Sequence, residues 1–408
     1  MSKAAFFPPF TSFDGKVFHN ADFKDAEFVD KVTFRNAQFN GTTDFRGAKF
    51  NGVADFTGAQ FLGDVDFEGA AFTEPLRFDK IRFAGKTNFS GVHFRHDAHF
   101  SETEFAGNSD FSKAVFHAWG LFNKSVFKAG MTFESVCFLG SGNFAEVDFA
   151  TDADFRKARF VAFADFHDAK FQGETNFSGS NIECKTMFRN AAFSKGADFS
   201  DCRFTNPVNF SGATFTAAAN FERVIFLQFV DFASTHFNDS FILSPPQGSQ
   251  GLAPEIRFES VALANPGKVR FSNVSFEKIT LMGTNLRGIL FENSRWPRKG
   301  LLKSTKRAVV YDEIQRAAPD PQQLAELYRD IRANLKKAGA TADLGDLLYS
   351  EMEVRRKQRR GPGDSLYFLR RYFSPYTLLW ITCGYGRRPL RLVVAVAGVL
   401  ALAYVVAK

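Results

Sequence analysis

The amino-acid sequence predicts an all-β solenoid, followed by an α-helical hairpin and one C-terminal transmembrane helix. The first observation behind this prediction is composition, since the 408 residues include 53 Phe but only 8 Tyr and 3 Trp. Such an excess indicates one structural slot that is repeated many times. The second is spacing, because the Phe recur alternately five and six residues apart. The third is the segment 392–407, which carries no charged residue.

The Phe register is nearly perfect. Between residues 34 and 237 it defines 38 positions, of which 37 are Phe and one is Ile182. The residue two before each Phe is usually small or β-branched, as in Ala37 and Ala48. Residues i and i−2 of an extended chain share one face. Each unit therefore turns one large and one small side chain inward, which predicts short strands stacked as parallel ladders. The candidate core ladder, taken at every second period, is Phe45, Phe67, Phe89, Phe111, Phe133, Phe155, Phe177 and Phe199.

Asp or Asn stands just before the Phe that closes most six-residue steps. The candidate corner ladder is Asp44, Asp66, Asn88, Asp110, Asp154, Asn176, Asp198 and Asn220. Asp and Asn side chains bond to nearby backbone, so we interpret this ladder as turn chemistry at corners that need an extra residue. The alternative is an acidic ladder that imitates DNA phosphates. Residues 1–243 hold 24 basic and 30 acidic residues, a balance of −6, which is weak for a DNA mimic.

The repeated unit resembles the pentapeptide-repeat family, whose motif is A-(D/N)-(L/F)-x-x. The sequence "ADF" at residues 54–56, 153–155 and 197–199 matches that motif, and the alternating spacing is similar to a Phe-rich branch of the family. The resemblance covers about residues 13–291. It implies a right-handed quadrilateral parallel β-helix with four units, or 22 residues, in each coil. It says little about function, because one fold hosts many roles.

Breaks in the pattern predict the domain boundaries. In the C-terminal part, Leu324, Leu327, Tyr328, Ile331 and Leu335 recur at helical spacing. The expected parts are an N-terminal cap (1–12), a pentapeptide-repeat β-helix (13–243), a Pro/Gly/Ser-rich loop (244–255), final coils closed by Trp296 and Pro297 (256–297), a helical hairpin (305–360), a basic and aromatic juxtamembrane segment (361–388) and a transmembrane helix (389–408).

The C-terminal segments point to a membrane. Ten Lys or Arg lie between residues 355 and 391, opposed by the single acid Asp364. The side of a span that is richer in Lys and Arg stays in the cytoplasm, where anionic lipids attract such residues. We therefore expect a single-pass protein of the bacterial inner membrane with its rod in the cytoplasm. The alternative is a buried helix of a soluble domain. The candidate membrane-interface residues are Arg370, Arg371, Trp380, Arg387, Arg388 and Arg391.

No motif in the sequence indicates catalysis. We find no P-loop, GxSxG, HExxH or paired-carboxylate pattern, and none of the four Cys stands in a C-x-x-C pair. Cys202 occupies an inward small-residue position, so we assign it to the core. His93, His96 and His99 fall on successive faces and are read as surface residues. The sequence therefore predicts no catalytic, metal or cofactor-binding site.

The function predicted from the sequence is a non-enzymatic, membrane-anchored scaffold. Its rod faces would bind an unknown protein partner, and homo-oligomers remain open, whereas small-molecule substrates and nucleic acid are not expected. The alternative is the cytoplasmic and first-helix portion of a two-helix ion channel, because "YGRRPLR" at residues 385–391 resembles the junction before such a pore. A third, weaker reading is a DNA-mimicking protein that protects gyrase.

Overall fold

The computed structural model describes residues 6–248, 254–300, 306–315 and 319–358, together with Leu379, Val393 and residues 396–398. The chain divides into two compact units. The N-terminal unit holds residues 1–257 and 261–265, and the C-terminal unit holds residues 258–260 and 266–408. Each unit is described by itself.

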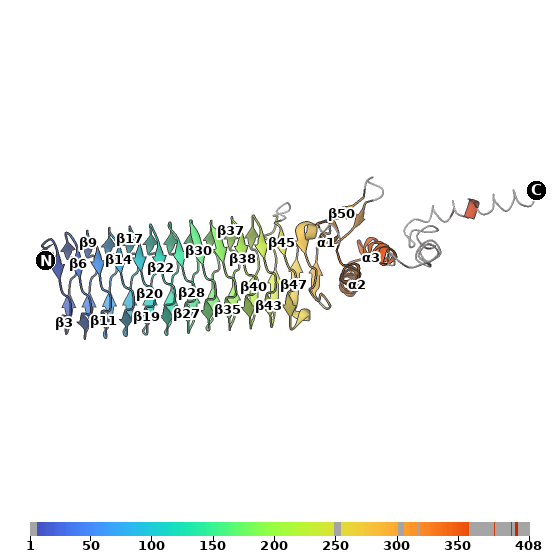
Figure 1. The fold of residues 1–408 in the computed structure, drawn as a ribbon. Coiled ribbons are helices and arrows are strands. Elements are labelled where there is room, and N and C mark those ends of the chain that lie inside the picture. Colours follow the sequence, from blue (N-terminus) through green and yellow to red (C-terminus); the bar gives the residue numbers. More distant parts are fainter. Residues whose placement is uncertain are drawn as a thin grey trace, which may run out of the picture. The chain divides into compact units, whose positions relative to one another are not determined.

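The N-terminal unit is a four-sided parallel β-solenoid, which confirms the predicted fold class (Figure 1). The chain visits sheets A, B, C and D in turn, and each strand pairs with the equivalent strand one coil away. Val65, for example, pairs with Thr43 on one side and with Thr87 on the other. One coil therefore takes 22 residues, or two Phe periods. In Figure 1, strands of sheets A and B follow the upper side of the unit and strands of sheets C and D follow the lower side.

The strands are short, and most have two residues. Sheet A contains β1 (Phe6–Phe7), β5 (Glu27–Phe28), β9 (Lys49–Phe50), β13 (Ala71–Phe72), β17 (His93–Phe94), β21 (Val115–Phe116), β25 (Cys137–Phe138), β29 (Arg159–Phe160), β33 (Asn181–Ile182), β37 (Arg203–Phe204) and β41 (Ile225–Phe226). Sheet B contains β2 (Thr11–Ser12), β6 (Val32–Thr33), β10 (Ala54–Asp55), β14 (Leu76–Arg77), β18 (Ala98–His99), β22 (Gly120–Leu121), β26 (Gly142–Asn143), β30 (Phe163–Asp165), β34 (Lys185–Met187), β38 (Val208–Asn209), β42 (Val230–Asp231) and β45 (Ile256–Arg257).

The other two sides follow the same plan. Sheet C contains β3 (Val17–Phe18), β7 (Gln38–Phe39), β11 (Gln60–Phe61), β15 (Arg82–Phe83), β19 (Glu104–Phe105), β23 (Val126–Phe127), β27 (Asp148–Phe149), β31 (Lys170–Phe171), β35 (Ala192–Phe193), β39 (Thr214–Phe215), β43 (His236–Phe237) and β46 (Ala262–Leu263). Sheet D contains β4 (Ala21–Asp22), β8 (Thr43–Asp44), β12 (Val65–Asp66), β16 (Thr87–Asn88), β20 (Ser109–Asp110), β24 (Met131–Thr132), β28 (Ala153–Asp154), β32 (Thr175–Asn176), β36 (Ala197–Asp198), β40 (Ala219–Phe221) and β44 (Phe241–Leu243).

Stacked phenyl rings fill the interior of the N-terminal unit. The eight residues of the candidate core ladder are fully buried. Their successive ring centroids lie 4.7–5.1 Å apart with planes within 15° of parallel. A facing ladder meets them edge-on, as where Phe122 and Phe133 lie 5.4 Å apart at 89°. The edge-on contacts suit the ring quadrupole, and the parallel stacks continue the apolar interior along the axis.

The four corners of a coil are of two kinds. The five-residue steps, which follow sheets B and D, close in tight turns whose third residue is left-handed, such as Lys124 (φ 60°) and Lys157 (φ 55°). In the tight turn at residues 34–37, the Ala37 N–H donates to the Phe34 carbonyl at 3.1 Å. The six-residue steps, which follow sheets A and C, contain wider bends. There an Asp often accepts from the backbone one coil on, as Asp64 does from the Lys86 N–H at 2.8 Å.

The corner ladder stabilises a different corner from the one we expected. Each of its eight side chains accepts a hydrogen bond from the backbone N–H two residues on, as Asp110 does from Ser112 at 2.7 Å. That N–H belongs to the tight five-residue turn that follows, whereas we had assigned the ladder to the corner with the extra residue. The extra residue is instead taken up by the wide bends.

The C-terminal unit contains a coil and a group of helices. Trp296 is buried and stacks on Phe276, with ring centroids 4.5 Å apart. The segment 306–311, which we expected to begin the helical hairpin, is extended, so the helices start later, at Asp312. The elements are 3₁₀ turns η1 (Pro266–Lys268) and η2 (Phe276–Lys278), strands β47 (Val269–Ser272), β48 (Ile279–Thr280), β49 (Leu290–Glu292), β50 (Arg298–Lys299) and β51 (Arg307–Ala308), and helices α1 (Asp312–Gln315), α2 (Pro321–Lys337) and α3 (Leu344–Gln358).

Helices α2 and α3 pack against each other, as the helical spacing predicted. Asp320 caps α2 by accepting from the Gln322 N–H at 3.0 Å, and Pro321 occupies the first helical position, where no donor is needed. The five apolar residues at helical spacing are all buried. At the other end of the chain, β1 begins at Phe6, so the expected N-terminal cap already contains part of the first coil.

Replacing one stacked ring should destabilise the solenoid strongly. Phe122 is fully buried between Phe100 and Phe144, 4.8 and 4.9 Å away. We expect Phe122→Ala to lower the free energy of unfolding by about 3–5 kcal/mol, since neighbouring coils cannot collapse into the cavity. Urea denaturation followed by circular dichroism measures the loss. The control is Leu62→Ala, whose side chain is 45% exposed and should cost less than about 0.5 kcal/mol. If Phe122→Ala and Leu62→Ala lost equal amounts of unfolding free energy, the assignment of the Phe side chains to the interior would be wrong.

The corner ladder should contribute less per residue. Asp110→Ala removes the acceptor of the Ser112 N–H and should cost about 1 kcal/mol, measured in the same way. Asp110→Asn keeps an oxygen acceptor and should be close to neutral. If the Asn variant lost as much stability as the Ala variant, the charge of this carboxylate and not its turn hydrogen bond would be the important property.

Candidate interaction surfaces

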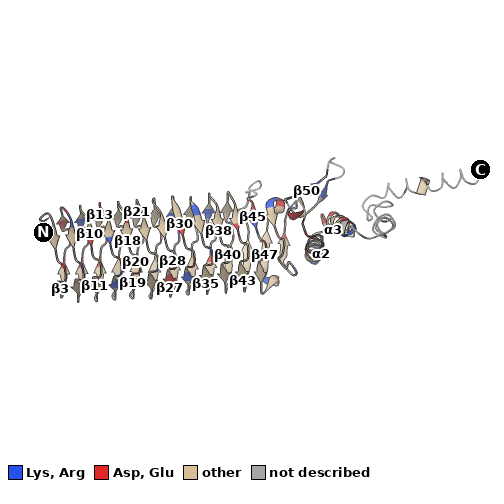
Figure 2. Cartoon of the chain, viewed as in Figure 1, with Lys and Arg blue, Asp and Glu red and all other residues tan. Residues whose placement is uncertain are grey.

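The outward positions of the N-terminal unit form ladders of alternating charge. Basic and acidic residues are interspersed along the unit (Figure 2). At one left-handed turn position, Lys80 approaches Glu102 and Lys124 approaches Glu146, both at 3.9 Å across neighbouring coils. Such exposed pairs contribute little to stability. They do fix a regular pattern of charge on a rigid support, which is a property that a protein partner could recognise.

Two thiols of the N-terminal unit, those of Cys184 and Cys202, are structural. The structure places Cys202 in the core, where its Sγ donates to the Phe177 carbonyl at 2.9 Å, and burial raises the pKa of this thiol. Burial also raises the pKa of Cys184 to about 11. A thiol needs its thiolate form to act as a nucleophile, so neither residue is suited to that role at neutral pH.

The three histidines at residues 93–99 do not converge. His93 is nearest to His117, with ring centroids 5.9 Å apart. His96 Nδ1 accepts from the Asp97 N–H at 2.9 Å, and His99 Nδ1 lies 3.9 Å from an oxygen of Asp79. Within the described ranges, no group of His, Cys, Asp and Glu is arranged to hold a metal ion.

The predicted membrane segments fall almost entirely outside the described residues. This applies to Arg370, Arg371, Trp380, Arg387, Arg388 and Arg391, so the structure places none of the candidate membrane-interface residues. Among the residues that are described, no helix is both long enough and apolar enough to cross a bilayer.

A buried carboxylate closes the coil of the C-terminal unit. Asp312 is fully buried, and its oxygens accept from the N–H groups of Leu281 and Met282 at 2.9–3.1 Å. In a repeating coil, such N–H groups bond to carbonyls of the next coil, as Phe34 does to the Asp55 carbonyl. The carboxylate thus replaces the carbonyls that a further coil would supply. Burial raises the pKa of Asp312 above its ordinary value.

Helix α2 completes this closure. Asn334 donates to the Leu286 carbonyl at 2.6 Å and accepts from the Gly288 N–H at 2.9 Å. Tyr328, also buried, donates to Glu313 at 2.5 Å and accepts from the Val310 N–H at 3.2 Å. Each of these buried polar groups is therefore satisfied, and the helices are joined to the coil by specific hydrogen bonds.

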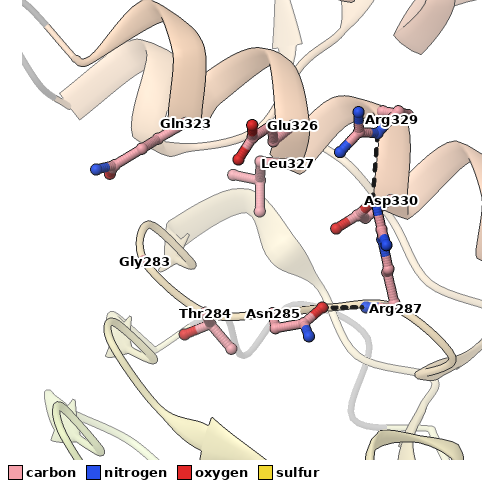
Figure 3. A pocket seen from close by; sticks show the side chains of 9 residues that line it. All are labelled: Gly283, Thr284, Asn285, Arg287, Gln323, Glu326, Leu327, Arg329 and Asp330. Carbon is pink, nitrogen blue, oxygen red and sulfur yellow. Dashed lines mark hydrogen bonds and ion pairs between the residues drawn. The ribbon is translucent and has the colours of Figure 1, made fainter.

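A cavity of about 470 Å³ lies beside these contacts (Figure 3). Arg287 Nε and Arg329 Nε approach one oxygen of Asp330 at 3.3 and 3.6 Å, so the charges on its wall largely neutralise one another. The residues that line it are Gly283, Thr284, Asn285, Arg287, Gln323, Glu326, Leu327, Arg329 and Asp330.

Sequence reasoning missed the closure by Asp312 and Asn334. A faint signal exists, because Asp312 directly follows the apolar run Val309, Val310 and Tyr311, where an isolated acid is unexpected. Asn334 carries no such signal, since a single Asn in an amphipathic helix is usually a surface residue.

Comparison with known proteins supports the repeat assignment. A family model described as pentapeptide repeats (9 copies) matches residues 34–82, 45–93, 162–203 and 199–242. Residues 34–93 and 162–242 of the β-solenoid are thus similar to pentapeptide repeats. No curated protein and no solved structure matches the chain.

Removing the closing carboxylate should unfold the C-terminal unit more easily. Asp312→Ala leaves the N–H groups of Leu281 and Met282 buried without an acceptor, which should cost about 1–3 kcal/mol. Trp296 is buried in the same unit, so its fluorescence during urea denaturation reports the loss. Asp312→Asn retains one acceptor and is the matched control. An Ala variant as stable as the wild type would show that the carboxylate does not close the coil.

The raised pKa of Asp312 predicts that the free energy of unfolding depends on pH. The pKa of Asp312 is raised in the folded state, so folding is favoured by the protonated carboxyl. This contribution is fully present below the ordinary carboxyl pKa of 3.8 and is lost as the pH rises through the folded pKa. Relative to Asp312→Asn, the wild type should therefore lose unfolding free energy as the pH is raised from about 4 towards 7. If the wild type instead gained unfolding free energy relative to Asp312→Asn over that range, the pKa of Asp312 would be lowered in the folded state and the prediction would be wrong.

Proposed function

We propose that this pentapeptide-repeat solenoid is a non-enzymatic scaffold, held by its C-terminal segment at the cytoplasmic face of the bacterial inner membrane. The observation that carries the scaffold role is the constant 22-residue register, seen where Val65 pairs with Thr43 and Thr87. In this register the Phe rings fill the interior, and the outward positions are free to vary. A solenoid of this kind offers long rigid faces rather than a reaction chamber.

The protein partner would bind these outward faces. Charged side chains there are held at a spacing of one coil, as in the ladder of Lys80, Glu102, Lys124 and Glu146. Complementary charges on a partner would fix its register along the unit and exclude partners with the wrong pattern.

The membrane location rests on the sequence of the C-terminal segments. Residues 392–407 are uncharged, and ten Lys or Arg precede them between residues 355 and 391. Sixteen helical residues span about 24 Å, short of a bilayer core of about 30 Å. If the span begins at Pro389, Arg391 can extend its charged end to the interface and the length suffices. Arg370, Arg371, Arg387 and Arg388 would bind anionic lipid, with Trp380 at the interface.

Deleting residues 389–408 tests the anchor. We expect the full chain in a membrane fraction that resists high salt, and the shortened chain in a fraction that high salt releases at least in part. High salt should release the shortened chain because its remaining basic residues attract lipid only electrostatically, and salt screens that attraction. Replacing residues 389–408 by an unrelated transmembrane helix should restore resistance to salt.

Two outcomes would contradict this arrangement. The shortened chain could stay on the membrane in high salt, or a protease added outside intact spheroplasts could digest the solenoid. The first outcome would show that residues 389–408 are not the anchor. The second would show that the solenoid does not lie in the cytoplasm.

A further inference from the structure

The exposed apolar side chains of the N-terminal unit gather on one corner. Among its described residues, seven large apolar side chains are exposed. Val17 lies in sheet C, and Leu62 lies on the corner between sheets C and D. The other five lie on the corner between sheets A and B, which we call the A–B ridge: Phe10 (65% exposed), Val29 (46%), Trp119 (45%), Leu139 (37%) and Leu227 (36%).

The coil register places these residues along one corner. Trp119 lies between β21 and β22, Leu139 between β25 and β26, and Leu227 between β41 and β42. Strands β21 and β25 are neighbours in sheet A, so the coils that hold Trp119 and Leu139 are about 4.8 Å apart. The half-buried Phe163 continues the apolar surface one coil further. The ridge therefore has an apolar centre near the middle of the unit and further apolar residues near its ends.

Four of the five ridge residues are symmetrically spaced, and Phe10, in the first coil, lies outside this set. Sheet A has eleven strands, and the coils of Val29, Trp119, Leu139 and Leu227 are those of its second, sixth, seventh and eleventh strands. A two-fold axis between the sixth and seventh coils, perpendicular to the long direction of the unit, exchanges the second coil with the eleventh. Such an axis is what a symmetric dimer requires, since each residue must find its partner in the same patch.

We propose that the A–B ridge joins two copies of this chain side by side in antiparallel orientation. Val29 of one copy then faces Leu227 of the other, and the coil of Trp119 faces the coil of Leu139. This arrangement covers four of the exposed apolar side chains, those of Val29, Trp119, Leu139 and Leu227. It does not depend on membrane anchoring.

One charge pair along the ridge supports this pairing, whereas Arg95 and Asp97 of the fifth coil face the uncharged residues 161–163 of the eighth. The loop of the fourth coil carries Glu74 and faces the loop of the ninth coil, residues 183–185, in the partner copy. There Lys185 is exposed, whereas Glu183 already bonds to Arg159 at 2.9 Å. Glu74 and Lys185 are thus opposite charges within reach, and the two-fold axis produces this pair twice. The loop with Asp30 and Lys31 faces residues 227–229, which carry no charge.

The area buried in the contact indicates whether the dimer is permanent or transient. Nine steps separate the coils of β5 and β41, so the ridge is roughly 43 Å long at about 4.8 Å per coil. A strip about 10 Å wide then buries roughly 900 Å² over both copies, which is below the range of stable specific complexes and typical of weak, transient ones. We therefore expect dimerisation that depends on concentration rather than a permanent dimer.

Cross-linking of the full chain tests the proposal. The background carries Cys137→Ser and Cys383→Ser, and a bismaleimide with a span of about 10 Å joins thiols across the contact. A mixture of Val29→Cys and Leu227→Cys proteins should give a cross-linked dimer, whereas either protein alone should give several-fold less. Leu62→Cys, at a similarly exposed position on another corner, is the negative control. The reaction is run on membrane and soluble fractions alike, so that failure of the anchor does not affect the result.

A second variant tests the centre of the ridge. Trp119→Asp places like charges near the two-fold axis and should reduce the cross-linked yield of the Val29→Cys and Leu227→Cys mixture at least several-fold. Its unfolding curve should match that of the wild type, because the side chain points outward. Self-linking of Val29→Cys as strong as the mixture would indicate a parallel pair and overturn the proposal. No cross-link in any fraction would also overturn it and leave a lipid surface or another protein as the occupant.

Discussion

The stacking of phenyl rings is the interaction on which the rest of the structure depends. A two-residue strand cannot hold a sheet by itself, and the strands exist because each is followed or closed by a ring that stacks on its equivalents above and below. Centroid distances of 4.7–5.1 Å in the core ladder equal the spacing of parallel strands within a few tenths of an ångström. Because rings and strands share one repeat, a Phe at each position serves both, and the single exception, Ile182, replaces one stacked ring without breaking sheet A.

This constraint explains which parts of the fold could be predicted from the sequence. The register of 37 Phe and Ile182 is periodic and can be recognised in the sequence alone. It predicted the parallel solenoid and its inward residues. The wide and tight corners were harder, because their difference lies in backbone dihedral angles such as φ 60° at Lys124, a residue type with no preference for that region. The A–B ridge was missed because its residues do not share one position of the repeat, since Leu139 and Leu227 directly follow their strands and Trp119 is the third residue after its own. Asp312 and Asn334 were missed because their partners are backbone groups about 30 to 48 residues away.

The closing of the coil in the C-terminal unit follows from the same physics. A parallel solenoid leaves unpaired backbone groups at each end, and such groups bind other chains unless they are covered. Asp312 supplies acceptors and Asn334 supplies both a donor and an acceptor, so helices and side chains perform the role of an additional coil. The sequence between the solenoid and the C-terminal basic residues thereby has a structural purpose. The functions proposed above rest instead on the outward faces of the N-terminal unit and on the uncharged segment 392–407.

The central claim is that one coil of 22 residues, set by alternating five- and six-residue steps, is the unit of folding. Deleting residues 112–133 removes one whole coil and keeps the alternation, whereas deleting residues 112–116 places two six-residue steps in succession and removes a tight turn. Urea denaturation followed by circular dichroism compares the two. We predict that the 22-residue deletion retains the β-sheet signal and most of the unfolding free energy, while the five-residue deletion, although much smaller, loses several kcal/mol (about 3 or more, as for other core defects). Equal stability of the two deletions, or greater stability of the shorter one, would contradict the claim.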